Sequence, residues 1–199
     1  MTNIVRRRLL VGFMIALLGG VFPTIGFAQG RRDAVVIGMA QEPDILGPFT
    51  GMGAAGVIQN SLFAFYAPYN EKWVRTPLLV EKIPTVQDGD WEILPNNKMR
   101  VKWRLRKGFT WHDGRPVTAL DVRFTYGMLR NPRTPARSRF LLERIDNILV
   151  PDVNDPYTFV VQWNALWPFA NRTPYGLEYT LPRHSLESAY LRDPSRLTA

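Results

Sequence analysis

Cysteine is absent from this chain of 199 residues, and histidine occurs only twice, as His112 and His184. The lack of cysteine excludes a disulfide framework, a thiolate metal site and a lipid anchor on an N-terminal cysteine. Two histidines leave little from which to build an imidazole site, so we expect no metal and no cofactor. The catalytic patterns G-x-S-x-G and H-E-x-x-H are also missing.

The residues that are present indicate a globular protein, with 46% hydrophobic and 12% aromatic residues. The first 28 residues differ from the rest. Three arginines precede the apolar run Leu9 to Leu18, and Gly26 and Ala28 form a small-x-small site before Gln29. This arrangement is typical of a secretory signal, so we expect residues 1–28 to be cleaved and the protein to be periplasmic. An uncleaved membrane anchor is the alternative, although several glycines and Pro23 make a poor transmembrane helix.

The net charge of +8 is concentrated in one part of the chain. Residues 98–144 hold thirteen basic side chains against Asp113, Asp121 and Glu143, whereas the rest of the mature chain is net acidic. Within residues 98–106, apolar and basic residues alternate with period two, which predicts a strand with an apolar face inward and a cationic face outward. Trp103 would lie opposite the cations and could not help them to stack bases, so nucleic acid is not an expected partner.

Other segments carry local signals for secondary structure. Thr118 and Asp121 form a capping-box pattern and Asn131-Pro132 a stop, which predicts a helix over residues 119–130. Asparagines at 96 and 97 predict a turn between two strands. We further predict a helix over residues 57–63 and strands over residues 34–40, 79–86, 91–94, 145–150 and 157–163.

The most specific stretch runs from Leu105 to Val122, with the order Leu-Arg-Lys-Gly, Trp-His-Asp-Gly-x-Pro and a capped helix. It resembles the shared core segment of the family 5 extracytoplasmic solute-binding proteins, the peptide, nickel and oligosaccharide receptors of ABC importers. The resemblance implies an α/β fold, namely a partial two-lobed periplasmic binding protein fold with an additional inserted domain. Members of this family are more than twice as long, so the chain is interpreted as an N-terminal fragment without the second lobe.

On this resemblance, residues 29–65 begin lobe one, residues 66–173 form the inserted mixed α/β domain, and residues 174–199 return to lobe one. The implied function is that of a monomeric receptor that captures a small solute, most simply a peptide, and delivers it to an ABC permease in the inner membrane. On the same resemblance, it is not expected to be an enzyme. The alternative is a stand-alone secreted module that binds anionic surfaces through its basic face.

Two sets of residues are candidates for a site. Glu42 and Asp44 follow the first predicted strand, where carboxylates could meet a cationic group of a solute, although a solvated turn explains them equally well. His112, Asp113 and Arg115 invite a catalytic interpretation in which His112 is the base of a hydrolase. Adjacent side chains rarely face each other, and no nucleophile motif accompanies them. Turn chemistry at Asp113-Gly114 is therefore the preferred explanation.

Overall fold

The computed structural model of the protein describes residue 36 and residues 38–42, 53–134, 139–152, 154–172 and 179–194. The chain divides into two compact units, Met1–Gly38 and Met39–Ala199. Only Val36 and Gly38 of the first unit are described, so the fold below is that of the second. None of the helices in these ranges is long and apolar enough to span a membrane.

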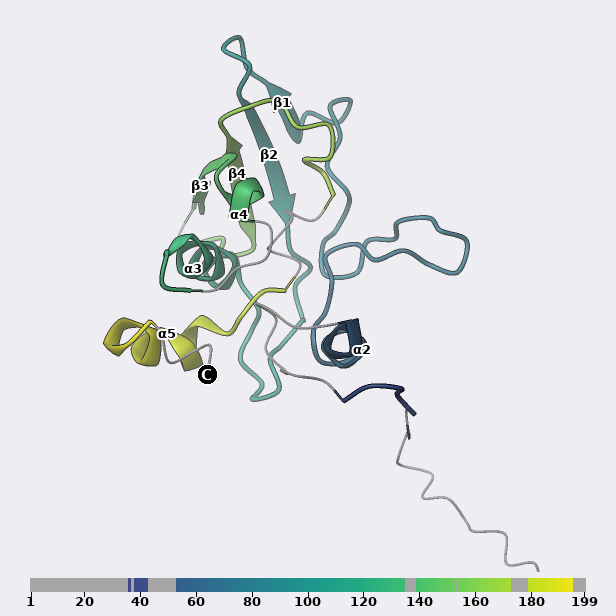
Figure 1. The fold of residues 1–199 in the computed structure, drawn as a ribbon. Coiled ribbons are helices and arrows are strands. Elements are labelled where there is room, and N and C mark those ends of the chain that lie inside the picture. The colour runs from purple at the N-terminus through teal and green to yellow at the C-terminus, as the bar shows by residue number, and fades with distance from the viewer. Residues whose placement is uncertain are drawn as a thin grey trace, which may run out of the picture. The chain divides into compact units, whose positions relative to one another are not determined.

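The second unit is built on a four-stranded antiparallel sheet in the order β1-β2-β4-β3 (Figure 1). Its strands are β1 (Trp91–Ile93), β2 (Met99–Arg104), β3 (Ile145–Leu149) and β4 (Thr158–Trp163). The central pair is in continuous register from Met99 opposite Trp163 to Arg104 opposite Thr158. The described helices are α2 (Gly53–Leu62), α3 (Ala119–Arg130), α4 (Arg139–Leu142) and α5 (Arg183–Arg192).

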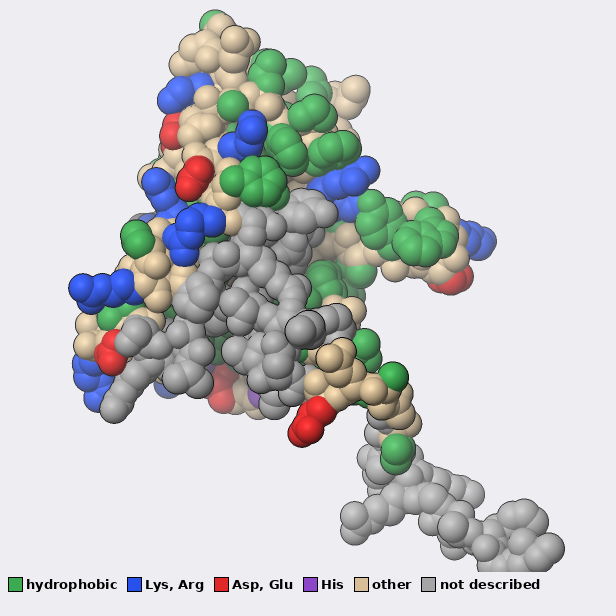
Figure 2. All heavy atoms as spheres, in the orientation of Figure 1, with side chains coloured by type: hydrophobic (Ala, Val, Ile, Leu, Met, Phe, Trp, Pro, Cys, Tyr) green, Lys and Arg blue, Asp and Glu red, His purple; other side chains and the backbone are tan. Residues whose placement is uncertain are grey.

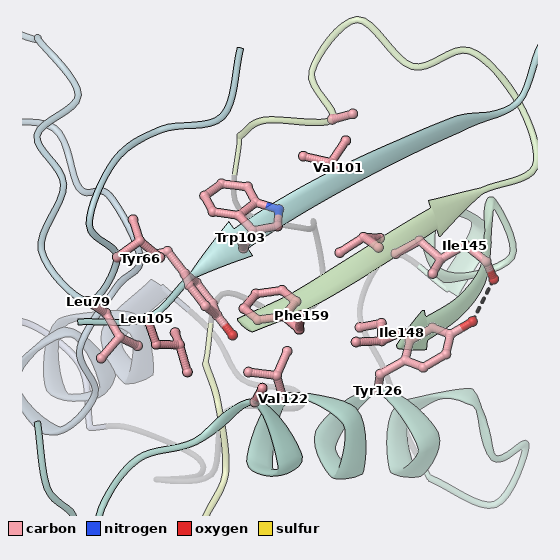
Figure 3. Packing of buried hydrophobic residues seen from close by; sticks show 14 of the residues in the cluster. Tyr66, Leu79, Val101, Trp103, Leu105, Val122, Tyr126, Ile145, Ile148 and Phe159 are labelled. Carbon is pink, nitrogen blue, oxygen red and sulfur yellow. Dashed lines mark hydrogen bonds between the residues drawn. The ribbon is translucent and has the colours of Figure 1, made fainter. Parts of the chain in front are cut away.

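The core lies between one face of the sheet and α3 (Figure 3). Trp103 of β2 and Phe159 of β4 are fully buried and stack nearly parallel, with ring centroids 6.4 Å apart. Val122 and Tyr126 project from α3 toward β4 and β3, and the Tyr126 hydroxyl donates a hydrogen bond to the carbonyl oxygen of Ile145. Large aromatic side chains in this layer bury much of the apolar area that stabilises the sheet against the helix.

Three segments with a clear sequence pattern form the elements that were predicted for them. α3 has the predicted bounds, with Asp121 Oδ2 accepting hydrogen bonds from the backbone N–H and the hydroxyl of Thr118. In β2 the apolar residues are buried and the basic ones are partly or fully exposed, as the alternation predicts. The turn before β2 is also confirmed, because Asn97 has a φ of 60° and the backbone N–H of Leu94 bonds to the carbonyl oxygen of Lys98.

Two strand predictions are wrong in the residues that can be compared. Val36 and residues 38–40 are not in a strand, and the side chain of Val36 is 92% exposed. A strand can be buried only when neighbours cover it, and no described segment pairs with this one. The stretch 79–86 forms a single isolated bridge, Val80 with Leu105. Pro84 lacks a backbone N–H and cannot extend that ladder.

Candidate functional site

The order Trp-His-Asp-Gly-x-Pro forms a tight hairpin loop ahead of α3. Backbone hydrogen bonds join Trp111 N–H to the Arg115 carbonyl and Val117 N–H to the Phe109 carbonyl, at 2.7 and 3.0 Å. Gly114 has a φ of 84°, a conformation that glycine adopts readily and other residues avoid. The turn interpretation of Asp113-Gly114 is therefore confirmed.

An open pocket of about 210 Å³ lies beside this loop. The loop contributes Phe109 and Trp111, the last residue of α2 and the one after it contribute Leu62 and Phe63, and Thr180 also lines the pocket. The remaining lining residues are Ala64, Leu79, Thr110, His112 and Val117. Apolar walls and a volume below the usual range for small-molecule sites fit a single apolar side chain better than a whole ligand.

Among the described residues, no hydrogen bond joins the side chains of His112 and Asp113. Asp113 Oδ2 instead lies 2.7 Å from Nε2 of His184, 71 residues further along the chain at the start of α5. The pKa of Asp113 is lowered, first by the backbone N–H of Arg115 and next by His184. No group of three His, Asp or Glu side chains in the described ranges could hold a metal ion. The arrangement ties the loop to the tail of the chain.

The tail is held on α3 by buried polar contacts. The backbone N–H of Leu181 donates to the Thr125 hydroxyl, and that of Arg183 donates to Asp121 Oδ1, both at 2.9 Å. Asp121 thus caps α3 and binds the tail through its two oxygens. The hydroxyls of Tyr66 and Thr180 lie 2.6 Å apart, and burial raises the pKa of Tyr66.

The predicted ligand carboxylates are only partly within the described chain. Glu42 is exposed to solvent, which suits a ligand group and a solvated turn equally. Asp44 lies outside the described residues. The structure therefore does not show whether the two side chains meet, and their role in solute binding remains a prediction.

The cationic face of β2 is partly neutralised by acidic neighbours. Arg104 Nη1 and Lys82 Nζ both lie 2.7 Å from Asp90 Oδ2, and Lys98 Nζ lies 2.9 Å from Asp146 Oδ2. A longer contact of 3.8 Å joins Arg100 to Glu92. These pairs reduce the positive charge that β2 presents to an anionic surface.

Sequence reasoning missed both the pairing of His184 with Asp113 and the double role of Asp121. Each depends on contacts between segments more than sixty residues apart, for which a single sequence carries no local signal. The capping pattern did identify Asp121 as a residue of structural importance. The pocket was also missed, although its aromatic residues belong to the most specific stretch of the sequence.

Comparison with known proteins identifies the family to which this sequence and fold are similar. The model of the middle part of the bacterial extracellular solute-binding proteins, family 5, matches residues 83–188, more than half of the chain. Protein XP55 of Streptomyces lividans is 30% identical over 161 residues, which cover 76% of this chain and 26% of that protein.

Solved structures show the same fold. An oligopeptide-binding protein from Thermus thermophilus in complex with a pentapeptide has a TM-score of 0.61 at 22% identity, over 72% of this chain and 24% of that one. The oligopeptide-binding protein AppA of Bacillus subtilis, in complex with a nonapeptide, has a TM-score of 0.58 at 20% identity, over 75% and 27%. The chain thus spans about a quarter of the length of the relatives that it matches.

Proposed function

Because the chain belongs to the bacterial extracellular solute-binding proteins of family 5, we propose that it is the N-terminal portion of a periplasmic receptor for oligopeptides. Proteins of this family are extracytoplasmic binding proteins, and the chain has their partial fold. The observation that carries the proposal is the family match over residues 83–188, which includes the whole sheet and the loop ahead of α3.

Peptide as the solute is supported by the structural neighbours, of which several were solved with or named for peptides. The receptor would capture the peptide without a chemical step, by closing two lobes over it, and would then deliver it to an ABC permease. Within this chain, Glu42 and Asp44 are the residues proposed to meet a cationic group such as the peptide amine. The exposed carboxylate of Glu42 is available for that contact.

Catalysis is not part of the proposal. Asp113 is paired with His184 and His112 is exposed, and among the described residues no hydrogen bond joins either imidazole to a hydroxyl group. The pairing observed here orients a loop rather than a reacting group.

Uptake of peptides tests the function. A strain that needs an amino acid supplied only as a peptide should stop growing when the gene is deleted and should recover when the gene is returned. Returning a Glu42→Gln, Asp44→Asn double variant should restore growth poorly, whereas Glu143→Gln, which changes an exposed carboxylate on the loop before β3, should restore it fully. Normal peptide uptake by the deletion strain would refute the proposal.

Peptide binding by the purified 199-residue chain tests its status as a portion of a receptor. In calorimetric titration with tri- to hexapeptides we expect no binding tighter than roughly 100 µM, since one lobe alone provides few of the contacts. Micromolar binding would show that these residues form a complete site. The intact mass of the protein purified from cells provides the complementary measurement, and we expect more than twice the mass of this chain.

A further inference from the structure

A short hairpin, residues 69–75, projects from the body of the second unit (Figure 1). We call it the aromatic hairpin. Its shape is held internally, because the side-chain oxygen of Asn70 accepts hydrogen bonds from the backbone N–H groups of Lys72 and Val74 at 3.0 and 2.9 Å. The backbone N–H of Asn70 also bonds to the Val74 carbonyl, and a bridge joins Tyr69 to Arg75. The hairpin therefore does not need a partner to become ordered.

The hairpin holds large apolar side chains in water. Trp73 is 83% exposed, Tyr69 and Val74 are more than half exposed, and the two aromatic rings lie 6.1 Å apart. Trp73 also has a φ of 57°, a left-handed conformation that costs a bulky residue about 1–2 kcal/mol. An exposed tryptophan on a strained backbone does not stabilise the isolated fold, which indicates that it contacts another molecule.

Two arginines at the base of the hairpin pair with no carboxylate in the described part of the chain. Arg75 Nη1 donates to the carbonyl of Asn171 at 2.8 Å, while its Nη2 is buried with no hydrogen-bond partner. The next residue, Arg172, lies over the ring of Phe169 at 4.2 Å and is in no ion pair among the described residues. Burial is the main cause that lowers the pKa of Arg75; the nearby Tyr69 opposes this, and Arg172 lowers it further.

These residues form one surface, the hairpin surface, made of the aromatic hairpin with Phe169 and Arg172. Lys72, Arg75 and Arg172 outnumber its one acidic residue, Glu71. Figure 2 shows basic side chains at the base and at the tip of the projection, next to its apolar side chains. Unlike Lys98 and Arg104, the cations at the base of the hairpin form no ion pair with a carboxylate of the described residues.

We propose that the hairpin surface binds the headgroup layer of a bilayer that contains anionic phospholipid. Tyr69 and Trp73 would enter the interfacial layer, where amphipathic aromatic rings are stable, and the exposed cations Lys72 and Arg172 would face lipid phosphates. A protein partner fits less well. A convex tip of seven residues offers far less than the roughly 800 Å² per partner of a specific protein interface, whereas a bilayer needs no matching hollow. The inference does not depend on the proposed solute.

A local measurement is required, because the apolar segment Leu9–Leu18 could itself bring the full chain to a vesicle. The full chain is mixed with vesicles of phosphatidylglycerol and phosphatidylcholine whose acyl chains carry bromine, which quenches nearby tryptophan. The difference in fluorescence between the natural chain and Trp73→Phe isolates the signal of Trp73. With the mixed vesicles, we expect at least half of the Trp73 fluorescence to be quenched. With vesicles of pure phosphatidylcholine, the quenched fraction should be at least threefold smaller.

Charge reversal tests the role of Arg172. Arg172→Glu should reduce the quenching of Trp73 at least threefold, whereas Arg123→Glu, the same change at an exposed position of α3, should leave it within experimental error. The proposal is overturned if Trp73 is not quenched, if both lipids quench it equally, or if the two charge variants behave alike. It is also overturned if millimolar free phosphate abolishes the quenching, which would indicate a small-anion site instead.

Discussion

The ion cluster at Asp90 allows the contribution of burial to an ion pair to be measured within one molecule. Asp90 is 5% exposed and its Oδ2 accepts hydrogen bonds from Lys82 and Arg104, both at 2.7 Å. Asp146 makes a comparable contact with Lys98 at 2.9 Å, but both side chains of this pair are 43% exposed. The pair Asp90→Ala and Asp146→Ala therefore removes the same atoms in two different environments.

We expect Asp90→Ala to lower the free energy of unfolding by about 2–3 kcal/mol. Each hydrogen bond to a charged group contributes about 1.5–3 kcal/mol. The expected loss is smaller than the sum of two such bonds, because the charged ends of Lys82 and Arg104 are partly exposed and can bind water in the variant. Asp146→Ala should cost about 0.5 kcal/mol, as an exposed pair does. In urea at neutral pH this corresponds to midpoints about 1 M apart if m is about 2 kcal/mol/M.

The dependence on pH has a defined sign. Burial alone would raise the pKa of Asp90, but hydrogen bonds from Arg104 and Lys82 outweigh it and the net pKa is lowered. The carboxylate therefore stabilises the fold above the unfolded-state pKa of about 4, and this contribution is lost as the pH falls through the lower folded-state value. The difference in free energy of unfolding between the natural chain and the Asp90→Ala variant should be constant from pH 7 to 5 and should become smaller below pH 4. Equal effects of the two alanine variants at pH 7, with unchanged m, would refute the reasoning.

Two further predictions concern the loop ahead of α3. Gly114→Ala should lower stability by about 1–2 kcal/mol because of its φ of 84° alone, since an added Cβ would meet no atom within 4 Å. Gly127 is equally unobstructed but lies inside α3, so Gly127→Ala should raise stability by about 0.5–1 kcal/mol. If the urea midpoints of the two variants moved in the same direction, the two predictions would be contradicted. His184→Ala should raise the pKa of the Asp113 carboxyl only in part, because the backbone N–H of Arg115 is the larger cause of its lowering. Side-chain NMR titration measures this, and an unchanged pKa of Asp113 would show that the two side chains do not meet in solution.

Elements marked by their own residues were predictable from the sequence. The bounds of α3 are set by Thr118 with Asp121 at one end and by Asn131-Pro132 at the other, all within one turn of the helix ends. β2 was predictable because its alternation needs only a sheet with one buried face. Local rules work here because the tertiary contacts agree with them.

The parts that were not predictable depend on distant segments. Whether residues 34–40 form a strand depends on neighbours that must pair with them, and apolar composition alone cannot supply those. The choice of His184 rather than His112 as the partner of Asp113 depends on how α5 lies against the loop. The basic face was predicted correctly in position, but its ion pairs were not predicted, because Asp90 and Asp146 come from outside the patterned stretch.

The hydrogen bond between Tyr66 and Thr180 has a consequence for how such a chain can be assembled. Two points 114 residues apart are brought to within 2.6 Å, so the intervening segment, which holds the entire sheet, starts and finishes at one spot. A segment of this kind can be gained or lost by a host fold with little disturbance, because the host needs to bridge only a short gap. It should equally accept new termini in an exposed turn once its present ends are joined by a short linker.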